Sequence, residues 1–232
     1  MKSNISSVGS AALVAGIAIL AMALTVPIVE FYIFPTLVDR NDPVRTVSNI
    51  IEHRKLFSLA IFIHFGTIIC DLVSGWALYL FFRPVNRNLA LLSAWFRILN
   101  SVFTAVALAN LVQIIVCLNN TELLNAMGED FGSRVMYHLK AFDLQWRFML
   151  IFFGIYMILL GSLTIRASYV PNIIGLLLVV AGIGYMVDNL KYFFYPDFDT
   201  GFLWFTYFGE LVFMFWLLFR GSRRSLPDPV DT

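Results

Sequence analysis

Long apolar stretches, separated by short polar or turn-forming segments, dominate the pattern of this chain. About 20 consecutive apolar residues are needed to cross the hydrocarbon core of a bilayer. Six stretches of about this length occur, at residues 8–33, 56–82, 88–118, 139–165, 171–194 and 201–219. The pattern therefore predicts an all-α protein, a polytopic membrane helix bundle of about six transmembrane helices that form a single membrane domain over residues 1–232.

Prolines mark the ends of several of these stretches. The second stretch stops at Arg83-Pro84, because the residue before a proline is pushed out of helical geometry. Pro171 suits the first turn of the fifth helix, where its missing N–H would have had no intrahelical partner. An even number of spans places both termini on the same side of the membrane.

The first apolar stretch can also be interpreted as a signal peptide. Lys2 precedes it, and Ala21-Met22-Ala23 resembles a cleavage site with small flanking residues. However, the apolar run continues past this site through Ile28 and Phe31. We therefore expect a retained transmembrane helix.

Two of the connections are long and have an amphipathic pattern. Asp42-Pro43 reads as a helix N-cap followed by proline, and the apolar residues from Val44 to Ile51 then recur at helical spacing. This pattern predicts a short amphipathic helix at the membrane interface. A second such helix is expected between Thr121 and Met136, in a loop rich in acidic residues.

Composition supports a membrane location and argues against a nucleic-acid partner. The chain is 59% hydrophobic and only 13% charged, whereas about a quarter of a soluble protein is charged. The 16 Lys and Arg residues are nearly balanced by 15 Asp and Glu residues, so no basic field would attract nucleic acid. Cys70 and Cys117 lie in apolar runs and are expected to be buried thiols, so we predict no metal and no cofactor.

The distribution of basic residues indicates how the chain is oriented in the cell (inner) membrane. Each side of the predicted bundle carries seven Lys or Arg residues. Those on the side of the termini lie in short turns and a compact tail, where basic residues determine topology most strongly. The loops on the other side are longer and contain nearly all of the loop acids. We therefore expect cytoplasmic termini.

Two ionisable residues lie deep within neighbouring predicted spans. Asp71 is about 15 residues into the second span, and Arg97 is about 9 residues into the third, which runs in the opposite direction. With a rise of about 1.5 Å per residue, both lie at a similar depth. The tight turn between the spans makes the helices antiparallel neighbours. We therefore predict a buried ion pair between Asp71 and Arg97.

A second group of polar residues is expected toward the opposite, loop-rich face. Their depths match on five helices, which predicts a hydrated vestibule open to that face. Its expected members are Glu30, His64, Asp143, Arg147, Tyr185, Asp188, Lys191 and Glu210, with Gln145 and Trp146 as further lining. Asp143 and Arg147 are four residues apart, so they share a helix face and can pair locally.

These residues also have a purely structural interpretation. Charges at membrane depth cost about 2.5–3.5 kcal/mol each, so each requires a partner, water or a function. Glu30, Asp143 and Lys191 lie near enough to helix ends to reach the headgroup region. The Asp71–Arg97 pair could equally act as a clamp that fixes helix register. A single buried histidine such as His64 is more often a contact between helices than a ligand.

The motifs of known intramembrane enzymes are absent from the sequence. It contains no GxSxG nucleophile elbow and no HExxH metal-binding helix. His53, His64 and His138 are far apart in the chain, which argues against a three-histidine zinc site. Small residues indicate close packing of helices instead; they are the glycines at positions 154, 161, 175, 182 and 184, together with Ala105 and Ala109.

Several segments, taken in order, resemble a known family. One is the turn region from Leu80 to Leu92, flanked by Asp71 and Arg97; the others run from Phe152 to Gly161 and from Pro171 to Asp188. Together they resemble the bacterial integral membrane family catalogued as domain of unknown function 4386. The resemblance covers roughly the first five helices, and it implies a multi-pass inner-membrane protein without an assigned activity. The stretch around Lys140 and the aromatic turn at 192–195 match the family less well, so nothing is transferred there.

Three classes of function remain open on the sequence. The first is a noncatalytic protein that binds or translocates a small solute or ion through its polar interior, using Asp71, Arg97, Asp188 and Glu210. The second is a structural or regulatory partner of another membrane protein, in which these charges pair internally. The third is an intramembrane enzyme acting on a lipid, for which a lipid headgroup bound to Asp188 or His64 would be the distinguishing observation.

Overall fold

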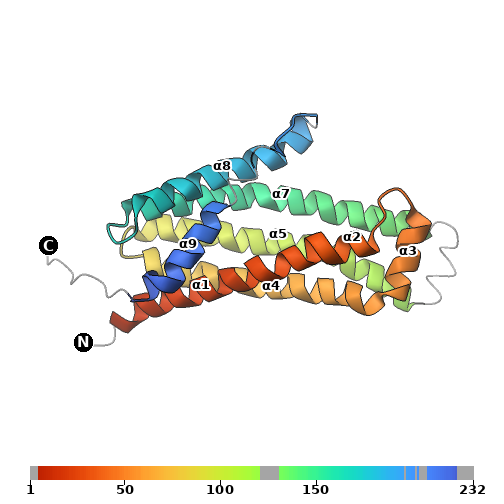
Figure 1. Ribbon diagram of the computed structural model, residues 1–232, viewed down its shortest axis with the longest axis horizontal. Coiled ribbons are helices and arrows are strands. Elements are labelled where there is room, and N and C mark those ends of the chain that lie inside the picture. Colours follow the sequence, from red (N-terminus) through yellow and green to blue (C-terminus); the bar gives the residue numbers. More distant parts are fainter. Residues whose placement is uncertain (1–4, 121–130, 196, 202, 204–207, 224–232) are drawn as a thin grey trace. The chain divides into compact units, whose positions relative to one another are not determined.

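The fold is helical in the computed structural model, which describes residues 5–120, 131–195, 197–201, 203 and 208–223 (Figure 1). Its elements are α1 (Ile5–Ile28), the π-helical turn η1 (Val29–Ile33), α2 (Phe34–Leu37), α3 (Pro43–Glu52), α4 (Arg54–Phe82), α5 (Arg87–Asn119), α7 (Phe131–Arg166), α8 (Asn172–Phe194), α9 (Phe208–Phe219) and the short 3₁₀ turn η4 (Gly221–Arg223).

Five stretches of the described residues are long and apolar enough to cross a membrane. They are Val8–Leu37, which runs from α1 through α2, and the helices α4, α5, α7 and α8. α9 is equally apolar and has twelve described residues, in the region where the sequence predicts the sixth span. The predicted fold class, a polytopic membrane helix bundle, is confirmed.

Large apolar side chains cover the outside of these helices. Phe31 is 81% exposed and Phe62 is 71% exposed. In the most apolar 18-residue stretch of α4, only 22% of the residues are buried. Contiguous apolar surface of this extent would be unstable in water, whereas acyl chains solvate it readily. The chain is therefore a multi-pass membrane protein.

The chain divides into two compact units, and several helices contribute residues to both. Unit 1 comprises residues 1–21, 70–100 and 150–232, and unit 2 comprises residues 22–69 and 101–149. Each unit contains its own buried side chains and its own group of ionisable residues.

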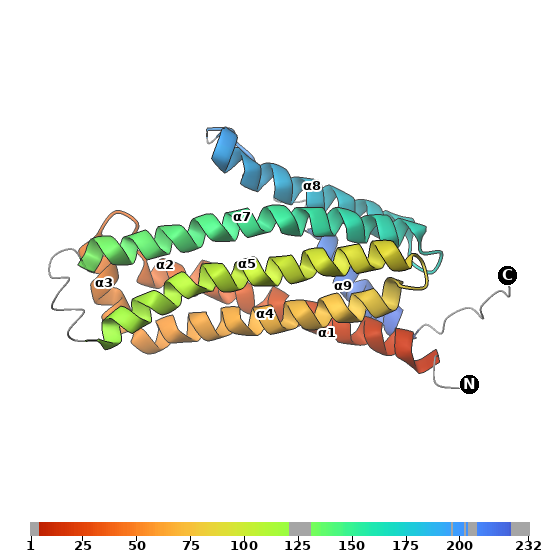
Figure 2. The ribbon, with the colours of Figure 1, turned by 180° about the vertical axis from the view of Figure 1, so that it is seen from behind.

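In unit 1, glycines bring the backbones of α7 and α8 into contact. A Cβ atom on Gly161 would lie 2.6 Å from the carbonyl oxygen of Gly175, and one on Gly182 would lie 2.6 Å from that of Gly154. The two glycines on each helix are seven residues apart, so both pairs lie on the facing sides of the helices. Figure 2 shows α7 and α8 side by side. Any side chain at these positions would push the helices apart.

α9 packs in unit 1 against α8 and the first part of α1. A Cβ atom on Gly209 would lie 2.5 Å from the carbonyl oxygen of Leu177, and one on Gly16 would lie 2.8 Å from a side-chain carbon of Leu218. Phe213 of α9 is fully buried. The contact between Gly209 and Leu177 sets the level at which the neighbouring Glu210 enters the bundle.

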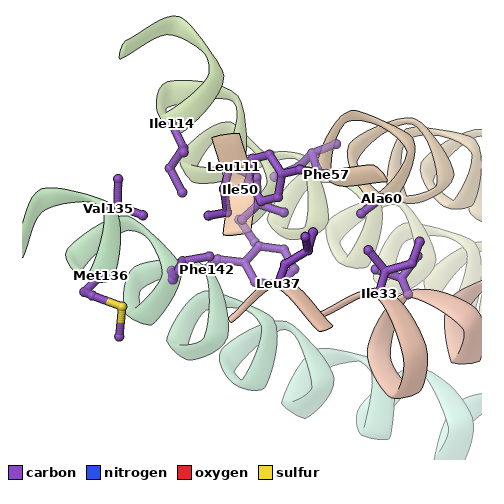
Figure 3. Close-up of a cluster of buried hydrophobic side chains, with 14 of the residues drawn as sticks. Ile33, Leu37, Ile50, Phe57, Ala60, Leu111, Ile114, Val135, Met136 and Phe142 are labelled. Carbon is purple, nitrogen blue, oxygen red and sulfur yellow. The ribbon is translucent and has the colours of Figure 1, made fainter. Parts of the chain in front are cut away.

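Unit 2 has a continuous apolar core to which its helices all contribute (Figure 3). Ile33 and Leu37 come from η1 and α2, and Ile50 comes from α3. Phe57 of α4 and Leu111 of α5 complete its centre, and both are fully buried. Because short α3 contributes to this core, its position is fixed by packing as well as by its caps.

The first long loop folds as predicted. The Asp42 side chain accepts a hydrogen bond from the backbone N–H of Arg45 (2.9 Å), and Pro43 occupies the first turn of α3. Ile50 is buried whereas Arg45 and Glu52 are exposed, so α3 is amphipathic, although Val44 of the expected apolar face is 78% exposed. A hydrogen bond from the Thr46 hydroxyl to the carbonyl oxygen of Asp39 (2.8 Å) ties the helix to the preceding loop.

Two boundaries differ from the predicted ones. α7 begins at Phe131, eight residues before the predicted position, because Phe131, Val135 and Leu139 continue its buried face. The end of the expected second interfacial helix is thus part of α7, and its residues 121–130 lie outside the described part of the chain. The first span continues past Ile33 to Leu37, because Pro35 occupies the first turn of α2 and is tolerated there.

Candidate functional site

Two places in the structure bring ionisable side chains together. The first is a buried group in unit 1, which we call the Arg97 cluster; it consists of Asp71, Arg97, Asn100, Tyr156 and Glu210. The second is a cavity in unit 2, which we call the Glu30 pocket; it is lined by Glu30, Phe34, Pro35, Val38, Arg40, Met136, Leu139, Lys140, Phe142 and Asp143.

The Arg97 cluster is organised around a buried guanidinium group. Nη2 of Arg97 lies 2.7 Å from Oδ1 of Asp71, and its Nη1 lies 3.7 Å from Oε1 of Glu210. The other carboxylate oxygen of Asp71 accepts a hydrogen bond of 2.6 Å from the Asn100 side chain. The cluster therefore links α4, α5 and α9, and its Asp71–Arg97 pair is withdrawn from solvent.

Aromatic rings and a glycine complete the surroundings of Arg97. Its guanidinium carbon lies 4.7 Å from the centre of the Tyr156 ring and 5.3 Å from that of Phe153, both on α7. Such cation–π contacts offset part of the desolvation of the cation. Gly75 lies against the aliphatic stem of Arg97, and a Cβ there would come within 3.0 Å of it. Arg97 itself is 1% exposed.

The Arg97 cluster is closely packed. The gap beside Tyr156, lined also by Gly75 and Tyr79, has no room for a water molecule between the described side chains. Asp71 and Arg97 form the pair that their depths predict. From its depth in the sixth predicted span, Glu210 was expected to lie near Glu30. It instead lies beside Arg97, because the contact of Gly209 with Leu177 places it near the start of α8.

Three further residues of the predicted vestibule lie in unit 1 and make local contacts. Asp188 and Lys191, one turn apart on α8, are 3.6 Å apart, and the Thr200 hydroxyl hydrogen-bonds to both. The Tyr185 ring meets that of Phe153 edge-on at 5.0 Å between centroids. This trio of Asp188, Lys191 and Thr200 connects the end of α8 to the segment that follows it.

The Glu30 pocket is a cavity of about 390 Å³ between two helical walls. One wall is a single face of α7, on which Met136, Leu139, Lys140 and Asp143 follow one another at helical spacing. The other wall consists of η1, α2 and the loop after them. A volume of this size matches the lower end of the range for small-molecule sites.

The backbone at Glu30 is a π-helical turn. The N–H of Phe34 donates to the carbonyl oxygen of Val29, five residues earlier, and Pro27 in the preceding turn has no N–H to donate. π-helical turns are frequent at functional sites, because the additional residue redirects one side chain. Here the carboxylate of Glu30, the only acid in the turn, faces the pocket.

Charges of both signs line the Glu30 pocket. Asp143 forms an ion pair with Arg40 at 3.0 Å, and this pair joins α7 to the loop after α2. Lys140 lines the same face of α7 one turn before Asp143. Arg147, the partner considered for Asp143 from sequence, lies one turn beyond it. The predicted vestibule did not include Arg40, which lies in a loop where basic residues usually face water, or Lys140, which lies at the very start of the fourth predicted span.

His64 is buried behind the pocket. Its ring is fully inaccessible and packs against those of Phe34, Phe142 and Trp146, with centroids 5.0 to 6.0 Å away. Nε2 lies 3.6 Å from Oε1 of Glu30, which is too long for a good hydrogen bond. Within the described residues, neither ring nitrogen has a hydrogen-bond partner. His64 thus separates the carboxylate of Glu30 from the apolar core.

The remaining polar side chains of unit 2 connect α5 with α7. The Asn110 side chain donates to Oε1 of Gln145 at 2.8 Å, and Nδ1 of His138 lies 3.3 Å from the Asn110 oxygen. These contacts keep Gln145 away from the Glu30 pocket. Among the residues that the structure describes, no three His, Cys, Asp or Glu side chains are grouped so as to hold a metal ion.

Comparisons with known proteins identify relatives but no activity. A family model described as "Domain of unknown function (DUF4386)" matches residues 14–221. An uncharacterized protein of Archaeoglobus fulgidus is 33% identical over 168 residues, which are 72% of this chain and 86% of the relative. No solved structure matches the chain.

Proposed function

This chain belongs to the DUF4386 family, whose domain has no known function, and we propose that it is a noncatalytic membrane protein that binds a small polar solute in the Glu30 pocket. The observation that supports this proposal is the combination of an open cavity with carboxylate and basic groups that converge on it. Small-molecule sites typically combine apolar walls with a few convergent polar groups.

The free-energy cost of placing charged side chains in a membrane supports the same proposal. Glu30, Lys140 and Asp143 all belong to stretches long and apolar enough to span a membrane. Charged side chains in such stretches are expensive, and they persist where they line a hydrated cavity or serve a function. Glu30 and Asp143 keep a third or more of their side-chain surface accessible, at 33% and 41%. A solute could therefore reach both carboxylates.

A structural role fits the Arg97 cluster better than a role in solute binding. Its cation is matched by the carboxylates of Asp71 and Glu210, and the Arg97 side chain itself is 1% accessible. This internal pairing favours the second function class, a structural or regulatory membrane partner, as an alternative for the protein as a whole. In that case the Glu30 pocket would bind no solute.

Protection of an introduced cysteine tests the proposal. Val38 lines the pocket and is partly accessible. In a background with Cys70→Ala and Cys117→Ala, we expect Val38→Cys to react with a membrane-impermeant maleimide in proteoliposomes. One class of small solute, from a panel of neutral, cationic, anionic and zwitterionic compounds, should slow this reaction. Ile50→Cys, buried in the core of the same unit, is the matched control and should stay unreactive.

Two outcomes would contradict solute binding. If Val38→Cys were as unreactive as Ile50→Cys, the pocket would be closed to water. If it reacted but no solute slowed it, the pocket would be an unspecific surface hollow, and the structural alternative would stand. Uptake of a protecting solute into the same proteoliposomes, compared with vesicles without protein, then distinguishes a transporter from a binding protein.

We further propose that the protein resides in the cell (inner) membrane with both termini in the cytoplasm. The basis is the placement of basic residues in the short turns on the side of the termini. Fusing a reporter that is active only in the cytoplasm to the C-terminus tests this orientation. A silent C-terminal fusion, together with an active fusion in the loop before α3, would reverse it.

A further inference from the structure

We propose that the solute bound by the Glu30 pocket is a small zwitterion, with its ammonium group at Glu30 and its anionic group at Lys140. This inference rests on the proposed solute-binding function and specifies its substrate class. It follows from three observations on unit 2: the order of the charges along the pocket, the pairing among them, and the aromatic rings between them.

The charges are ordered along the helices that form the walls. Glu30 lies two turns before the end of α2, whereas Arg40 lies in the loop beyond that end. On the opposite wall, Asp143 lies one turn further into α7 than Lys140, a difference of about 4.5 Å along the axis. Both carboxylates are therefore deeper than both cations. A bound molecule of complementary charge would have its cation inside and its anion toward the loop.

Pairing among these groups leaves one charge of each sign for a ligand. Asp143 and Arg40 satisfy each other at 3.0 Å. Nothing in the described part of the chain forms an ion pair with Lys140. The nearest basic group to Glu30 is His64, at 3.6 Å, and burial among three rings disfavours a charge on it. Glu30 and Lys140 are therefore the two groups that a ligand can neutralise.

The walls near Glu30 suit an ammonium group. Phe34 and Phe142 both line the pocket, and their rings meet edge-on with centroids 5.6 Å apart. Aromatic faces beside a carboxylate are the usual surroundings of bound ammonium and quaternary ammonium groups. A simple cation would leave Lys140 without a counter-charge, and a simple anion would leave Glu30 without one. A zwitterion compensates both.

Two sources could supply this chemistry. One is a free zwitterion from the aqueous phase, such as ethanolamine phosphate or an amino acid. The other is the headgroup of a zwitterionic lipid, such as phosphatidylethanolamine. The ordering of the charges favours the free molecule, because its cation can enter first from the loop side. The experiment includes both sources.

The test measures how far ethanolamine phosphate protects Val38→Cys from the maleimide. Ethanolamine and inorganic phosphate, which carry charge of one sign only, are the comparison probes. We expect the zwitterion to protect at concentrations at which neither single-sign probe does. Glu30→Gln and Lys140→Gln should each weaken protection about tenfold, as expected when a charge-assisted contact is lost. Glu30→Asp keeps the charge and should retain most of the protection.

Matched controls are available in the same unit. Glu52→Gln and Lys55→Gln remove one charge of each sign from exposed positions outside the pocket, and protection should be unchanged in both. Unaltered thermal unfolding of each variant ensures that a loss of protection does not reflect misfolding. For the lipid source, nanodiscs of phosphatidylethanolamine and of phosphatidylglycerol are compared. Protection in the former alone, dependent on Glu30 and Lys140, supports the zwitterion with a lipid as its source.

Other outcomes overturn the inference. If ethanolamine or phosphate alone protected as well as the zwitterion, or if Glu30→Gln and Lys140→Gln had no effect, the zwitterion class would be wrong. If only a solute of another class protected Val38→Cys, the solute-binding function would stand and this inference would fall. If no compound or lipid protected it, both would fall.

Discussion

Arg97 and Asp71 form an ion pair of 2.7 Å in which 1% and 4% of the two side-chain surfaces are accessible. The Asn100 amide holds the second oxygen of Asp71, and two aromatic rings cover the guanidinium group. A charge pair this deeply buried contributes little net stability when intact, because desolvation offsets the attraction. Removing one partner, however, leaves the other charge buried and uncompensated.

We therefore expect Asp71→Asn to lower the free energy of unfolding by roughly 3–5 kcal/mol. Reversible unfolding in mixed micelles measures the loss. Asp188→Asn, whose side chain is 27% exposed, is the control and should cost far less. The triple substitution Asp71→Leu, Arg97→Met and Glu210→Gln, which removes every charge of the cluster, should recover most of the stability. If Asp71→Asn and Asp188→Asn lowered the free energy of unfolding equally, the Asp71–Arg97 pair would not be a structural clamp.

Glu210→Gln should lower the free energy of unfolding less than Asp71→Asn does. Its carboxylate lies 3.7 Å from Arg97 and 18% of the side chain is accessible, so the attraction is weaker and partly screened. We expect a loss of about 1 kcal/mol in the same unfolding measurement. A loss as large as that of Asp71→Asn would mean that Glu210 is the principal counter-ion of Arg97.

Gly161→Ala should separate α7 from α8. The new Cβ would lie 2.6 Å from the carbonyl oxygen of Gly175, so the backbones must move apart, at a cost of about 1–3 kcal/mol. Gly66→Ala in α4 is the matched control, because no atom beyond the adjoining backbone of its own helix lies within 4 Å of its new Cβ. Since alanine is the better helix former, that variant should be as stable as the parent or more so. Thermal unfolding in detergent compares the two.

His64→Phe should retain or increase the thermal stability. The His64 ring is buried among three aromatic rings, and in the described structure its nitrogens lack hydrogen-bond partners, so phenylalanine removes two unsatisfied polar atoms. His64→Asp should be strongly destabilised, because it would place a second carboxylate beside Glu30. If His64→Phe instead melted well below the parent, His64 would have a polar partner of its own, such as a bound water molecule.

Features that follow from regular helix geometry could be predicted from the sequence. Asp71 and Arg97 flank a tight turn, so counting residues along two antiparallel helices places them at one depth. The glycines of α7 and α8 could be predicted in the same way, from their repeat at seven residues. The cap at Asp42-Pro43 is encoded within a few residues, and α3 begins where it indicates.

Features that depend on contacts between distant segments could not be predicted. Glu210 is at Arg97 because Gly209 packs against Leu177, and no local pattern reveals that contact. Arg40 reaches Asp143 because the loop after α2 folds back over α7. The π-helical turn at Glu30 also went unpredicted, since Pro27 marks a disturbed helix without specifying an additional residue.

That π-helical turn has a consequence for insertions and deletions in the first span. An α-helix advances by about 100° per residue, so the additional residue between Val29 and Ile33 offsets the helical phase by about that angle. Removing any one residue of the turn would restore regular geometry while rotating the faces on either side out of alignment. The sequence length of this short segment is therefore constrained more tightly than the identity of its apolar side chains.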